Sequence, residues 1–279
     1  TSRVLEEAGF THVSLVAAQA EPDPDFPTVP FPNPEEAGAL DMAIEQARAE
    51  DADLIIAVDP DADRCALAVP DPAAEAGWRP LSGDQIGCLL GEFLASRGIQ
   101  GSLANSIVSS RLLARIAHAH GLVHHTTLTG FKWIARAPEL AFGYEEAIGF
   151  CPNPAIARDK DGIASSVVAA SLFAALKTEE RTAWDELDRL AHAHGLHVTG
   201  PLTFRVEEIE QIATGMARLR AQPPSELAGS PVVEVSDLSE GYQGLPPTDG
   251  VLVLTKAGDR VIARPSGTEP KLKCYLEVI

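Results

Sequence analysis

The sequence has 279 residues, of which 45% are hydrophobic and 22% charged, as in an ordinary soluble globular protein of one to three domains. Its formal net charge of −18 argues against nucleic acid or an anionic membrane as a partner. It does not argue against an anionic substrate, because a few cationic loops can create a local positive pocket.

The four cysteines form no C-x-x-C pair, and their spacing suggests neither a zinc site nor a disulfide framework. The longest apolar stretch, residues 167–176, is shorter than the ~20 residues that span a bilayer, and no leader-like segment opens the chain. We therefore expect a cytoplasmic protein with no membrane partner. Thr1 begins in helix-like sequence and Ile279 ends in a strand-like one, so we expect a piece of a longer protein.

The first predicted elements alternate between helix and strand. We predict a helix over residues 1–8, a strand over 12–17, a proline-rich loop up to residue 34, a helix over 35–48 and a strand over 54–58. The last of these is an unbroken apolar run, which is typical of a parallel strand buried on both faces.

A second unit is predicted to begin near residue 81. Ser82 and Gln85 have the spacing of a capping box ahead of an apolar helix over residues 86–94. This alternation predicts an open, doubly wound α/β layer. The elements that continue it are strand 103–108, helix 111–120, strands 124–128 and 140–144, and helix 163–177.

The pattern changes near His197, where a small α+β unit with an antiparallel sheet is predicted. A hairpin signal, residues 257–259, lies between two apolar strands. In the last strand apolar residues alternate with Lys273, Tyr275 and Glu277, which predicts one buried face and one open face. The predicted fold class is thus α/β, with doubly wound α/β/α domains followed by this small domain. Its other elements are strand 202–206, helix 209–220 and strands 232–235, 251–255 and 260–264.

Three aspartates alternate directly after the apolar strand 54–58: Asp59, Asp61 and Asp63. Their mutual repulsion is costly unless a cation neutralises it, and the ligands on offer are all oxygen, which suits Mg²⁺ or Ca²⁺. Ligands in such folds also bind at the carboxyl ends of strands.

Other interpretations of this acidic loop remain open. An EF-hand is excluded, because Arg64 and Pro70 stand where it needs Gly and Glu. A phosphatase of the D-x-D type would use Asp59 as its nucleophile, and a solvated turn would need no ligand. Arg64 fits either a structural ion pair or a phosphate contact.

A basic, glycine-containing segment lies between the last two predicted strands. Arg264 offers a bidentate fork, Ser266 and Thr268 offer hydroxyl donors, and Gly267 lets backbone N–H groups approach a ligand. With Lys271 added, these residues predict a phosphate site, the alternative being an ordinary Ser-Gly turn. The chain has no Walker signature, which argues against a nucleoside triphosphatase.

Two adjacent carboxylates, Glu145 and Glu146, stand in a loop bounded by glycines, where they could accept hydrogen bonds from sugar hydroxyls. Segments 129–133 and 158–162 add hydroxyl and ammonium donors. Each of these signals is weak alone, and exposed loops explain them equally well. The histidines cluster around predicted helix ends without carboxylate or cysteine partners, so we expect them to be structural or exposed.

Taken in order, the acidic loop, T-G-F-K-W, G-Y-E-E-A-I-G, K-D-G and R-P-S-G-T-E-P-K-L-K resemble the α-D-phosphohexomutase family, most of all its phosphoglucomutase/phosphopentomutase branch. The resemblance covers nearly the whole chain, including the proline-rich stretches 23–29 and 33–36. A complete member would have four domains. This chain would hold part of the second (residues 1–80), the third, which binds the sugar (81–197), and the fourth, which binds phosphate (198–279).

The resemblance also implies an activity, an isomerase that moves phosphate between the 1- and 6-positions of hexoses or the 1- and 5-positions of pentoses. A phosphoserine and a sugar bisphosphate, which is both intermediate and activator, would carry the reaction, with one Mg²⁺ per site. The resemblance implies that Asp59, Asp61 and Asp63 bind Mg²⁺, that Arg64 binds the catalytic phosphate, and that Lys160 transfers a proton or contacts the substrate. It implies that the sugar is contacted by Glu145, Glu146, Thr129 and Lys132. It also implies that the nonreacting phosphate is bound by Arg264, Ser266, Gly267, Thr268 and Lys271.

Two departures from the family pattern matter. Ala147 stands where many hexomutases carry Ser, which removes one hydroxyl contact. The T-A-S-H-N-P type serine loop is absent, and Ser106, Ser109 and Ser110 lack its neighbours. We therefore expect a missing first domain of the same protein to carry the serine, and the chain alone to be inactive. The alternatives are a noncatalytic module that binds Mg²⁺ and sugar phosphate, or the D-x-D phosphatase.

Overall fold

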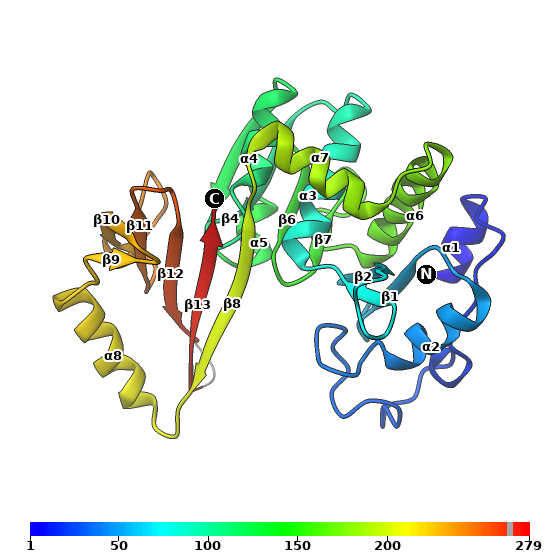
Figure 1. Ribbon diagram of the computed structural model, residues 1–279, viewed down its shortest axis with the longest axis horizontal. Helices are drawn as coiled ribbons and strands as arrows, with labels where there is room; N and C mark the ends of the chain where they lie inside the picture. Colours follow the sequence, from blue (N-terminus) through cyan, green and yellow to red (C-terminus); the bar gives the residue numbers. More distant parts are fainter. Residues whose placement is uncertain (267–269) are drawn as a thin grey trace.

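The computed structural model describes residues 1–266 and 270–279, which form three β-sheets with helices packed around them. Figure 1 shows the first 80 residues on one side, the last 80 on the other, and a middle part that joins them. No helix among the described residues combines the length and hydropathy that crossing a membrane requires.

The first part contains a small antiparallel sheet. Its strand order is β1-β2-β3, and α2 packs on β1 around Ile55. The elements of this part are α1 (Ser2–Glu7), the 3₁₀ helix η1 (Ala17–Gln19), α2 (Asp41–Glu50), β1 (Ile55–Val58), β2 (Cys65–Pro70) and β3 (Trp78–Pro80).

Three predictions for this part are wrong. The strand over 54–58 is antiparallel to β2, and only Ile55 of β1 is fully buried. Residues 12–16 are not a strand, because they lie mostly exposed and pair with no strand in the described chain, and an isolated strand leaves its backbone unpaired. The helix starts at Asp41, since Gly38 has a φ of 83°, which interrupts a right-handed helix.

The middle part is a four-stranded mixed sheet with helices on both faces. β4 lies parallel to β5 and β6, and β7 is antiparallel to β6, in the order β5-β4-β6-β7. Ser82 and Gln85 form the predicted capping box at the start of α3. The elements are α3 (Gly83–Ser96), β4 (Ser102–Ser106), α4 (Leu112–Ala119), β5 (Val123–Thr127), α5 (Phe131–Ile134), β6 (Leu140–Glu145), β7 (Gly149–Cys151), α6 (Gly162–Thr178) and α7 (Ala183–His194).

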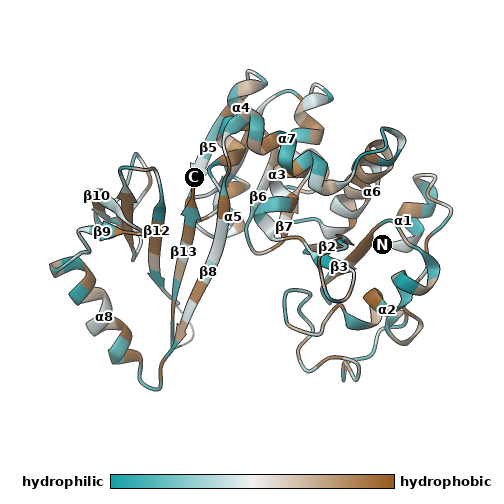
Figure 2. Ribbon diagram, in the orientation of Figure 1, coloured by the Kyte–Doolittle hydropathy of each residue, from teal (hydrophilic) through white to brown (hydrophobic). Residues whose placement is uncertain are grey.

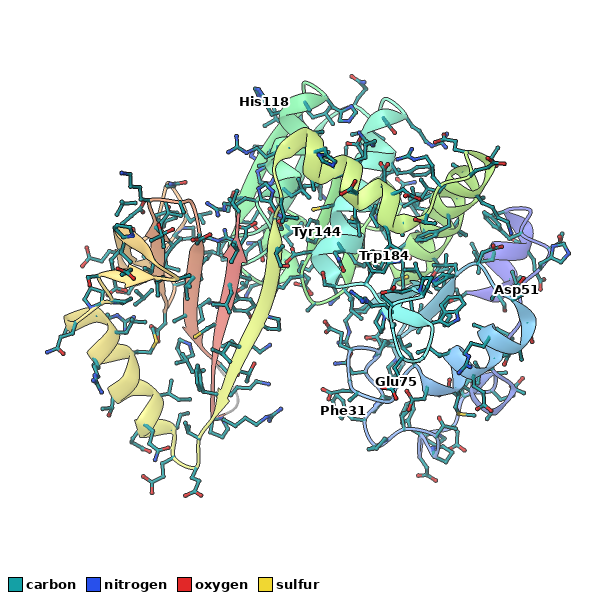
Figure 3. The ribbon with its side chains drawn as sticks, in the orientation of Figure 1. Phe31, Asp51, Glu75, His118, Tyr144 and Trp184 are labelled. Carbon is teal, nitrogen blue, oxygen red and sulfur yellow. The ribbon has the colours of Figure 1, made fainter. Side chains whose placement is uncertain are left out.

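Buried side chains on both faces of the middle sheet hold its helices in place. Tyr144, labelled in Figure 3, is fully buried with Phe142 and Phe150 between the sheet and helices α3, α4 and α6. On the opposite face Phe131 and Ile134 of α5 pack against Ala104. This layered arrangement confirms the predicted α/β class.

The last part is a six-stranded antiparallel sheet with the order β8-β13-β12-β11-β10-β9. Helix α8 covers one face with Ile212 and Met216, and Figure 2 shows the mixture of hydrophilic and hydrophobic residues along it. The elements are β8 (Val198–Arg205), α8 (Ile209–Ala221), β9 (Glu226–Leu227), β10 (Ser230–Asp237), η2 (Leu238–Glu240), β11 (Val251–Thr255), β12 (Arg260–Pro265) and β13 (Lys271–Val278).

The prediction for the last strand is only partly right. The apolar residues Leu272 and Cys274 face the α8 side, as expected, but Glu277 on the other face is 1% exposed. That face is not open to solvent, because Ile107 and Val108 of the middle part pack against it beside Leu252.

Candidate functional site

The acidic loop, residues 59–64, is the connection between the antiparallel strands β1 and β2. Carboxylate oxygens of Asp59, Asp61 and Asp63 all lie within 4.8 Å of one another. Ala62 adopts a left-handed φ of 56°, and its N–H bonds the Asp59 carbonyl at 2.9 Å, which folds the loop back on itself. The tight turn therefore gathers side chains that alternate in sequence.

Two cations already balance part of this negative charge. Arg64 donates its backbone N–H to Asp59 Oδ1 at 3.0 Å and its Nε to Oδ2 at 2.6 Å. Lys160 Nζ lies 2.7 Å from Asp63 Oδ2. Burial alone would raise the pKa of Asp59, but these bonds from Arg64 outweigh it and lower the pKa, so this carboxylate is ionised near neutrality.

The donor set of the acidic loop fits a hard divalent cation. Every candidate ligand is a carboxylate oxygen, the cluster is compact, and Asp61 remains exposed to solvent. Arg64 Nη1 also donates to Asn33 Oδ1 at 3.3 Å, which ties the proline-rich loop to this site. From the sequence this stretch was predicted only as a proline-rich loop and as part of the family pattern, not as a contact of the acidic loop.

The K-D-G segment is packed directly onto the acidic loop. Gly162 N–H donates to the Ala62 carbonyl at 3.0 Å, and a Cβ on Gly162 would meet the Arg64 carbonyl oxygen at 2.5 Å. Lys160 in turn covers Gly149, where a Cβ would meet its Cδ at 2.5 Å. Close backbone approach thus requires glycine at position 162, whereas at position 149 the side chain of Lys160 occupies the space that a Cβ would take.

The β6–β7 turn, residues 145–149, lies against the same strand as the acidic loop. Cys65 N–H donates to the Ile148 carbonyl at 3.0 Å, and Arg64 forms an isolated β-bridge with Gly149. Burial, followed by the charge of Glu146, raises the pKa of Glu145 to about 7, although Lys160 opposes the rise. Glu145 can therefore exchange a proton near neutral pH.

The side chain of Glu146 bonds to two serines that lie at and just after the end of β4. Its Oε2 accepts hydrogen bonds from the hydroxyls of Ser106 and Ser109, both at 3.0 Å. The sequence had suggested a sugar contact for Glu146, and neither serine was expected to matter. The sequence could have indicated these serines, because polar side chains at the carboxyl end of a parallel strand often belong to a binding site.

Thr129 and Lys132 lie at the same edge of the middle sheet. β4, β5 and β6 run parallel, so the residues that follow them emerge together. Thr129 is half-buried ahead of α5, whereas Lys132 is exposed with its Nζ 6.0 Å from the centre of the Trp133 ring. The structure therefore places them near the site edge without recording a contact to the acidic loop.

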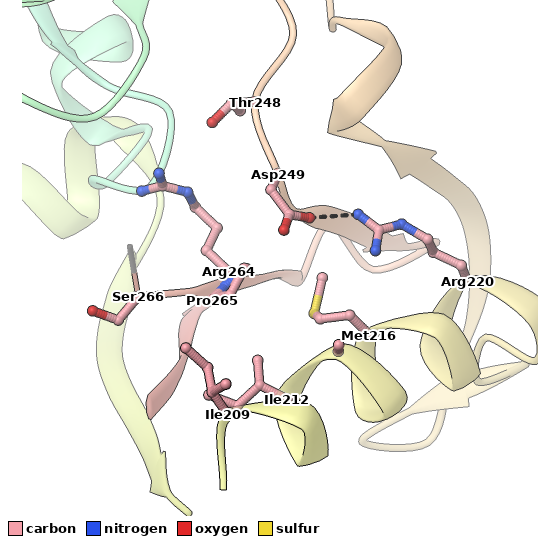
Figure 4. A pocket seen from close by; sticks show the side chains of 10 residues that line it. Ile209, Ile212, Met216, Arg220, Thr248, Asp249, Arg264, Pro265 and Ser266 are labelled. Carbon is pink, nitrogen blue, oxygen red and sulfur yellow. Dashed lines mark hydrogen bonds and ion pairs between the residues drawn. The ribbon is translucent and has the colours of Figure 1, made fainter. Parts of the chain in front are cut away.

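The predicted phosphate segment joins β12 and β13. Ser266 N–H donates to the Lys271 carbonyl at 2.8 Å and closes the connection, while Gly267 and Thr268 lie outside the described residues. Arg264 lines a cavity of about 460 Å³ together with Ile209 and other residues of α8, and Figure 4 shows its guanidinium extending away from α8. The Nε of Arg264 is buried and has no hydrogen-bond partner among residues 1–266 and 270–279.

Tyr275 connects this segment with the β6–β7 turn electrostatically. Burial raises the pKa of its phenol, the charges of Glu146, Glu145 and Glu35 raise it further, and Arg264 opposes them. Arg264 and the glutamates thus act on one side chain from all three parts of the chain. Sequence analysis identified Arg264, Glu145 and the aspartates but gave no sign that Tyr275 or Glu35 lies among them.

Family models match nearly the whole chain. Phosphoglucomutase/phosphomannomutase alpha/beta/alpha domain II matches residues 1–73, alpha/beta/alpha domain III matches 82–193, and the C-terminal domain matches 175–278. The chain belongs to the α-D-phosphohexomutase family. The resemblance inferred from the ordered motifs is confirmed.

Curated relatives of this phosphohexomutase chain carry several names. It is 45% identical to a "Probable phosphomannomutase" of Haemophilus influenzae, covering 99% of this chain and 56% of the relative. It is 35% identical to a phosphoribomutase of Saccharomyces cerevisiae (94% and 49% covered) and 33% identical to a phosphopentomutase of Homo sapiens (94% and 48%). The chain thus spans about half the length of the curated relatives it matches.

Solved structures support the fold of the phosphohexomutase chain. The open form of pp63/parafusin, a phosphoglucomutase from Paramecium, aligns with a TM-score of 0.65 at 19% identity, covering 89% of this chain and 45% of that one. A phosphoglucomutase/phosphomannomutase family protein from Burkholderia thailandensis aligns with a TM-score of 0.59 at 19% identity, covering 89% and 47%.

Proposed function

We propose that this chain forms the metal-, sugar- and distal-phosphate-binding part of a phosphosugar mutase, an isomerase of the intramolecular phosphotransferase type. One observation carries the proposal: the three carboxylates of the acidic loop lie within 4.8 Å of one another, while the K-D-G segment and the β6–β7 turn pack onto that loop. These are the contacts a phosphoryl-transfer site requires, namely oxygen ligands, an ammonium group and a hydroxyl acceptor.

In this proposal Asp59, Asp61 and Asp63 hold one Mg²⁺, which when bound neutralises charge on the transferring phosphoryl group. Arg64, fixed by Asp59 through Nε and by Asn33 through Nη1, directs its other N–H groups at the reacting phosphate. Lys160, whose pKa Asp63 raises against the effect of burial, stays protonated and donates from Nζ.

The other contacts bind and orient the sugar. Glu145 accepts hydrogen bonds from sugar hydroxyls, with Thr129 and Lys132 beside it at the edge of the middle sheet. Arg264 grips the nonreacting phosphate. A fixed phosphate site can hold either end of a bisphosphate intermediate that reorients between two transfers. The residues proposed to assist Arg264 are Ser266, Gly267, Thr268 and Lys271.

The nucleophile is proposed to lie in a segment outside these 279 residues, because no T-A-S-H-N-P type loop occurs in them. We infer that the chain alone has little mutase activity and that a further domain completes it. The division into parts 1–80, 81–197 and 198–279 stays a prediction. The substrate class is a phosphorylated hexose or pentose, as the names of the relatives suggest.

The D-x-D phosphatase alternative is disfavoured by the state of Asp59. Both of its carboxylate oxygens accept hydrogen bonds from Arg64, and its surface is only 5% exposed. A nucleophilic aspartate needs a free oxygen directed at the phosphorus.

Calorimetry with glucose 1-phosphate and MgCl₂ tests the proposal. We expect binding that needs magnesium and no turnover in a coupled assay with the chain alone. Absence of both magnesium and sugar-phosphate binding would overturn the proposed function. Turnover by the chain alone would overturn the inference about the missing nucleophile, and trapping of Asp59 by beryllium fluoride would favour the phosphatase.

A further inference from the structure

The β4–α4 segment, residues 106–110, runs from the last residue of β4 to the residue before Arg111, and it hydrogen-bonds to several other elements. All five residues are buried, with exposed fractions of 1–3%. Three of the five side chains, those of Ser106, Ser109 and Ser110, are nevertheless polar, and so is every backbone group. A buried polar segment is stable only when each group has a partner, so its partners reveal what it holds together.

One set of partners belongs to the β6–β7 turn. The hydroxyls of Ser106 and Ser109 lie 2.8 Å apart, and each lies 3.0 Å from the same oxygen of Glu146. The start of α3 holds the turn from another side, since a Cβ on Gly83 would meet the Glu146 carbonyl oxygen at 2.0 Å. Glu146 is thereby fixed, and with it the adjacent Glu145.

A second set of partners belongs to the C-terminal sheet. Arg260 donates from Nη1 to the Ile107 carbonyl at 2.8 Å and from Nη2 to the Ser109 carbonyl at 2.7 Å. Glu277 lies opposite Arg260 on β13, 3.1 Å from its Nη2, and accepts from the Ser110 hydroxyl at 2.9 Å. The planar fork of the arginine thus fits two carbonyls of one short segment.

Further contacts strengthen the same junction. Arg111, which follows the segment, donates its Nε to Glu277 at 2.6 Å and an Nη2 to the Gly258 carbonyl at 2.5 Å. Asp84 of α3 accepts from the Ser110 N–H at 2.7 Å and from the Tyr144 hydroxyl at 2.9 Å. Because a buried charge left without its partner is costly, these groups are expected to move together and not singly.

We propose that the β4–α4 segment is a positioning relay, in which Arg260 and Glu277 of the C-terminal sheet set the place of Glu145 through Ser106, Ser109 and Glu146. The inference rests on the proposed function for the identity of the ligand. Under it, Glu146 is a positioning residue and not a sugar contact. Strand β12 carries both Arg260 and Arg264, so under this proposal the sheet that binds the distal phosphate also positions the β6–β7 turn that binds the sugar.

A ligand comparison tests the first half of the relay. The double variant Ser106→Ala/Ser109→Ala removes both hydroxyls and leaves the Arg260 and Glu277 contacts intact. We expect its Kd for glucose 1-phosphate with MgCl₂ to rise about fivefold, the worth of a lost net hydrogen bond, and its Kd for inorganic phosphate to stay the same. Glu146→Gln, which keeps an acceptor oxygen, should retain more affinity for glucose 1-phosphate than Glu146→Ala. An unchanged Kd for glucose 1-phosphate in the double variant would overturn the relay.

Hydrogen–deuterium exchange of the unliganded chain tests the second half. Arg260→Lys keeps the positive charge but cannot reach two carbonyls at once, so amide exchange at residues 145–149 should become faster although the substitution lies in another sheet. The matched control is Arg220→Lys, which alters a fork to Asp237 and Asp249 in the same part of the chain. It should leave exchange at 145–149 unchanged.

The two experiments separate the two ideas. If the unaltered chain binds neither magnesium nor glucose 1-phosphate, the proposed function fails, and the exchange measurement alone decides the relay. If Arg260→Lys and the serine double variant both leave exchange at residues 145–149 as it was, the relay is wrong whatever the chain binds.

Discussion

Lys160 places its Nζ 2.7 Å from Oδ2 of Asp63, so an ammonium group lies directly against the carboxylate cluster of the acidic loop. The cluster is therefore partly neutralised before any divalent cation binds. Because the same ammonium also opposes the rise in the pKa of Glu145 in the β6–β7 turn, its charge acts on both the proposed metal site and the proposed sugar site. Removing it should affect the two sites in opposite directions.

Lys160→Met should tighten Mg²⁺ binding and weaken glucose 1-phosphate binding. The ammonium competes with the metal for Asp63, and a partly exposed ion pair is worth up to ~1 kcal/mol, so we expect a Kd for Mg²⁺ about two- to fivefold lower. Calorimetric titration with MgCl₂ and then with the sugar phosphate measures both. Weaker magnesium binding in this variant would show that Lys160 supports the metal site rather than opposing it.

Asp61→Asn should weaken Mg²⁺ binding by about tenfold or more, because a hard cation prefers an ionised oxygen and even indirect partners of a metal contribute ~10–100-fold. The matched control is Asp53→Asn, which removes an exposed ion pair with Lys177 in the same part of the chain. Titration with MgCl₂ compares the two variants. Equal affinity in both would remove Asp61 from the metal site.

Much of this architecture follows from local sequence signals. The capping box of Ser82, the hairpin at residues 257–259 and the alternation of α and β in the middle part all depend on neighbours in sequence, and all are present. The acidic loop was also identified correctly as a cluster, since its three aspartates are two residues apart. The antiparallel partner of β1 was missed, although β2 is a short apolar run, residues 65–69, of the kind that predicts a buried strand.

The long-range contacts of the site were harder still. Glu277 alternates with apolar residues as if exposed, yet Arg111 and Arg260 bury it, and each comes from another element. Ser109 carries no motif, and only the folded sheet brings it to Glu146. Such pairs join residues that are distant in sequence, so neither periodicity nor spacing along the chain can indicate them.

Glu145→Gln should change the pH dependence of stability. The pKa of Glu145 rises from 4.5 to about 7 on folding, so the stability it contributes is complete below pH 4.5 and is lost as the pH rises through 7. Glutamine cannot ionise, so the variant should avoid a loss of up to about 3 kcal/mol between these values.

Thermal unfolding at pH 5 and pH 8 measures this effect. Asp84, whose pKa burial raises to about 6, has the same sign and should keep part of the slope in the variant. A Tm difference between pH 5 and pH 8 identical in both proteins would mean that Glu145 is not protonated in the folded state at pH 5.

Gly162→Ala should destabilise the chain and disturb the acidic loop at once. The new Cβ would meet the carbonyl oxygens of Arg64 at 2.5 Å and Ala62 at 2.7 Å, and since both are backbone atoms the clash can be relieved only by moving one of the two loops. Overpacking of this kind costs ~1–3 kcal/mol, and the displaced loop should bind Mg²⁺ more weakly.

The chain offers a close control in Gly215→Ala. Gly215 lies within α8, and a Cβ there would meet nothing within 4 Å, so alanine should raise the free energy of unfolding by ~0.5–1 kcal/mol through its higher helix propensity. Urea unfolding should show a lower free energy of unfolding for Gly162→Ala and a higher one for Gly215→Ala. Titration with MgCl₂ should show weaker binding for Gly162→Ala alone. If the two alanine substitutions had the same effect on stability and on magnesium affinity, the close approach of the K-D-G segment to the acidic loop would not be the reason for glycine at position 162.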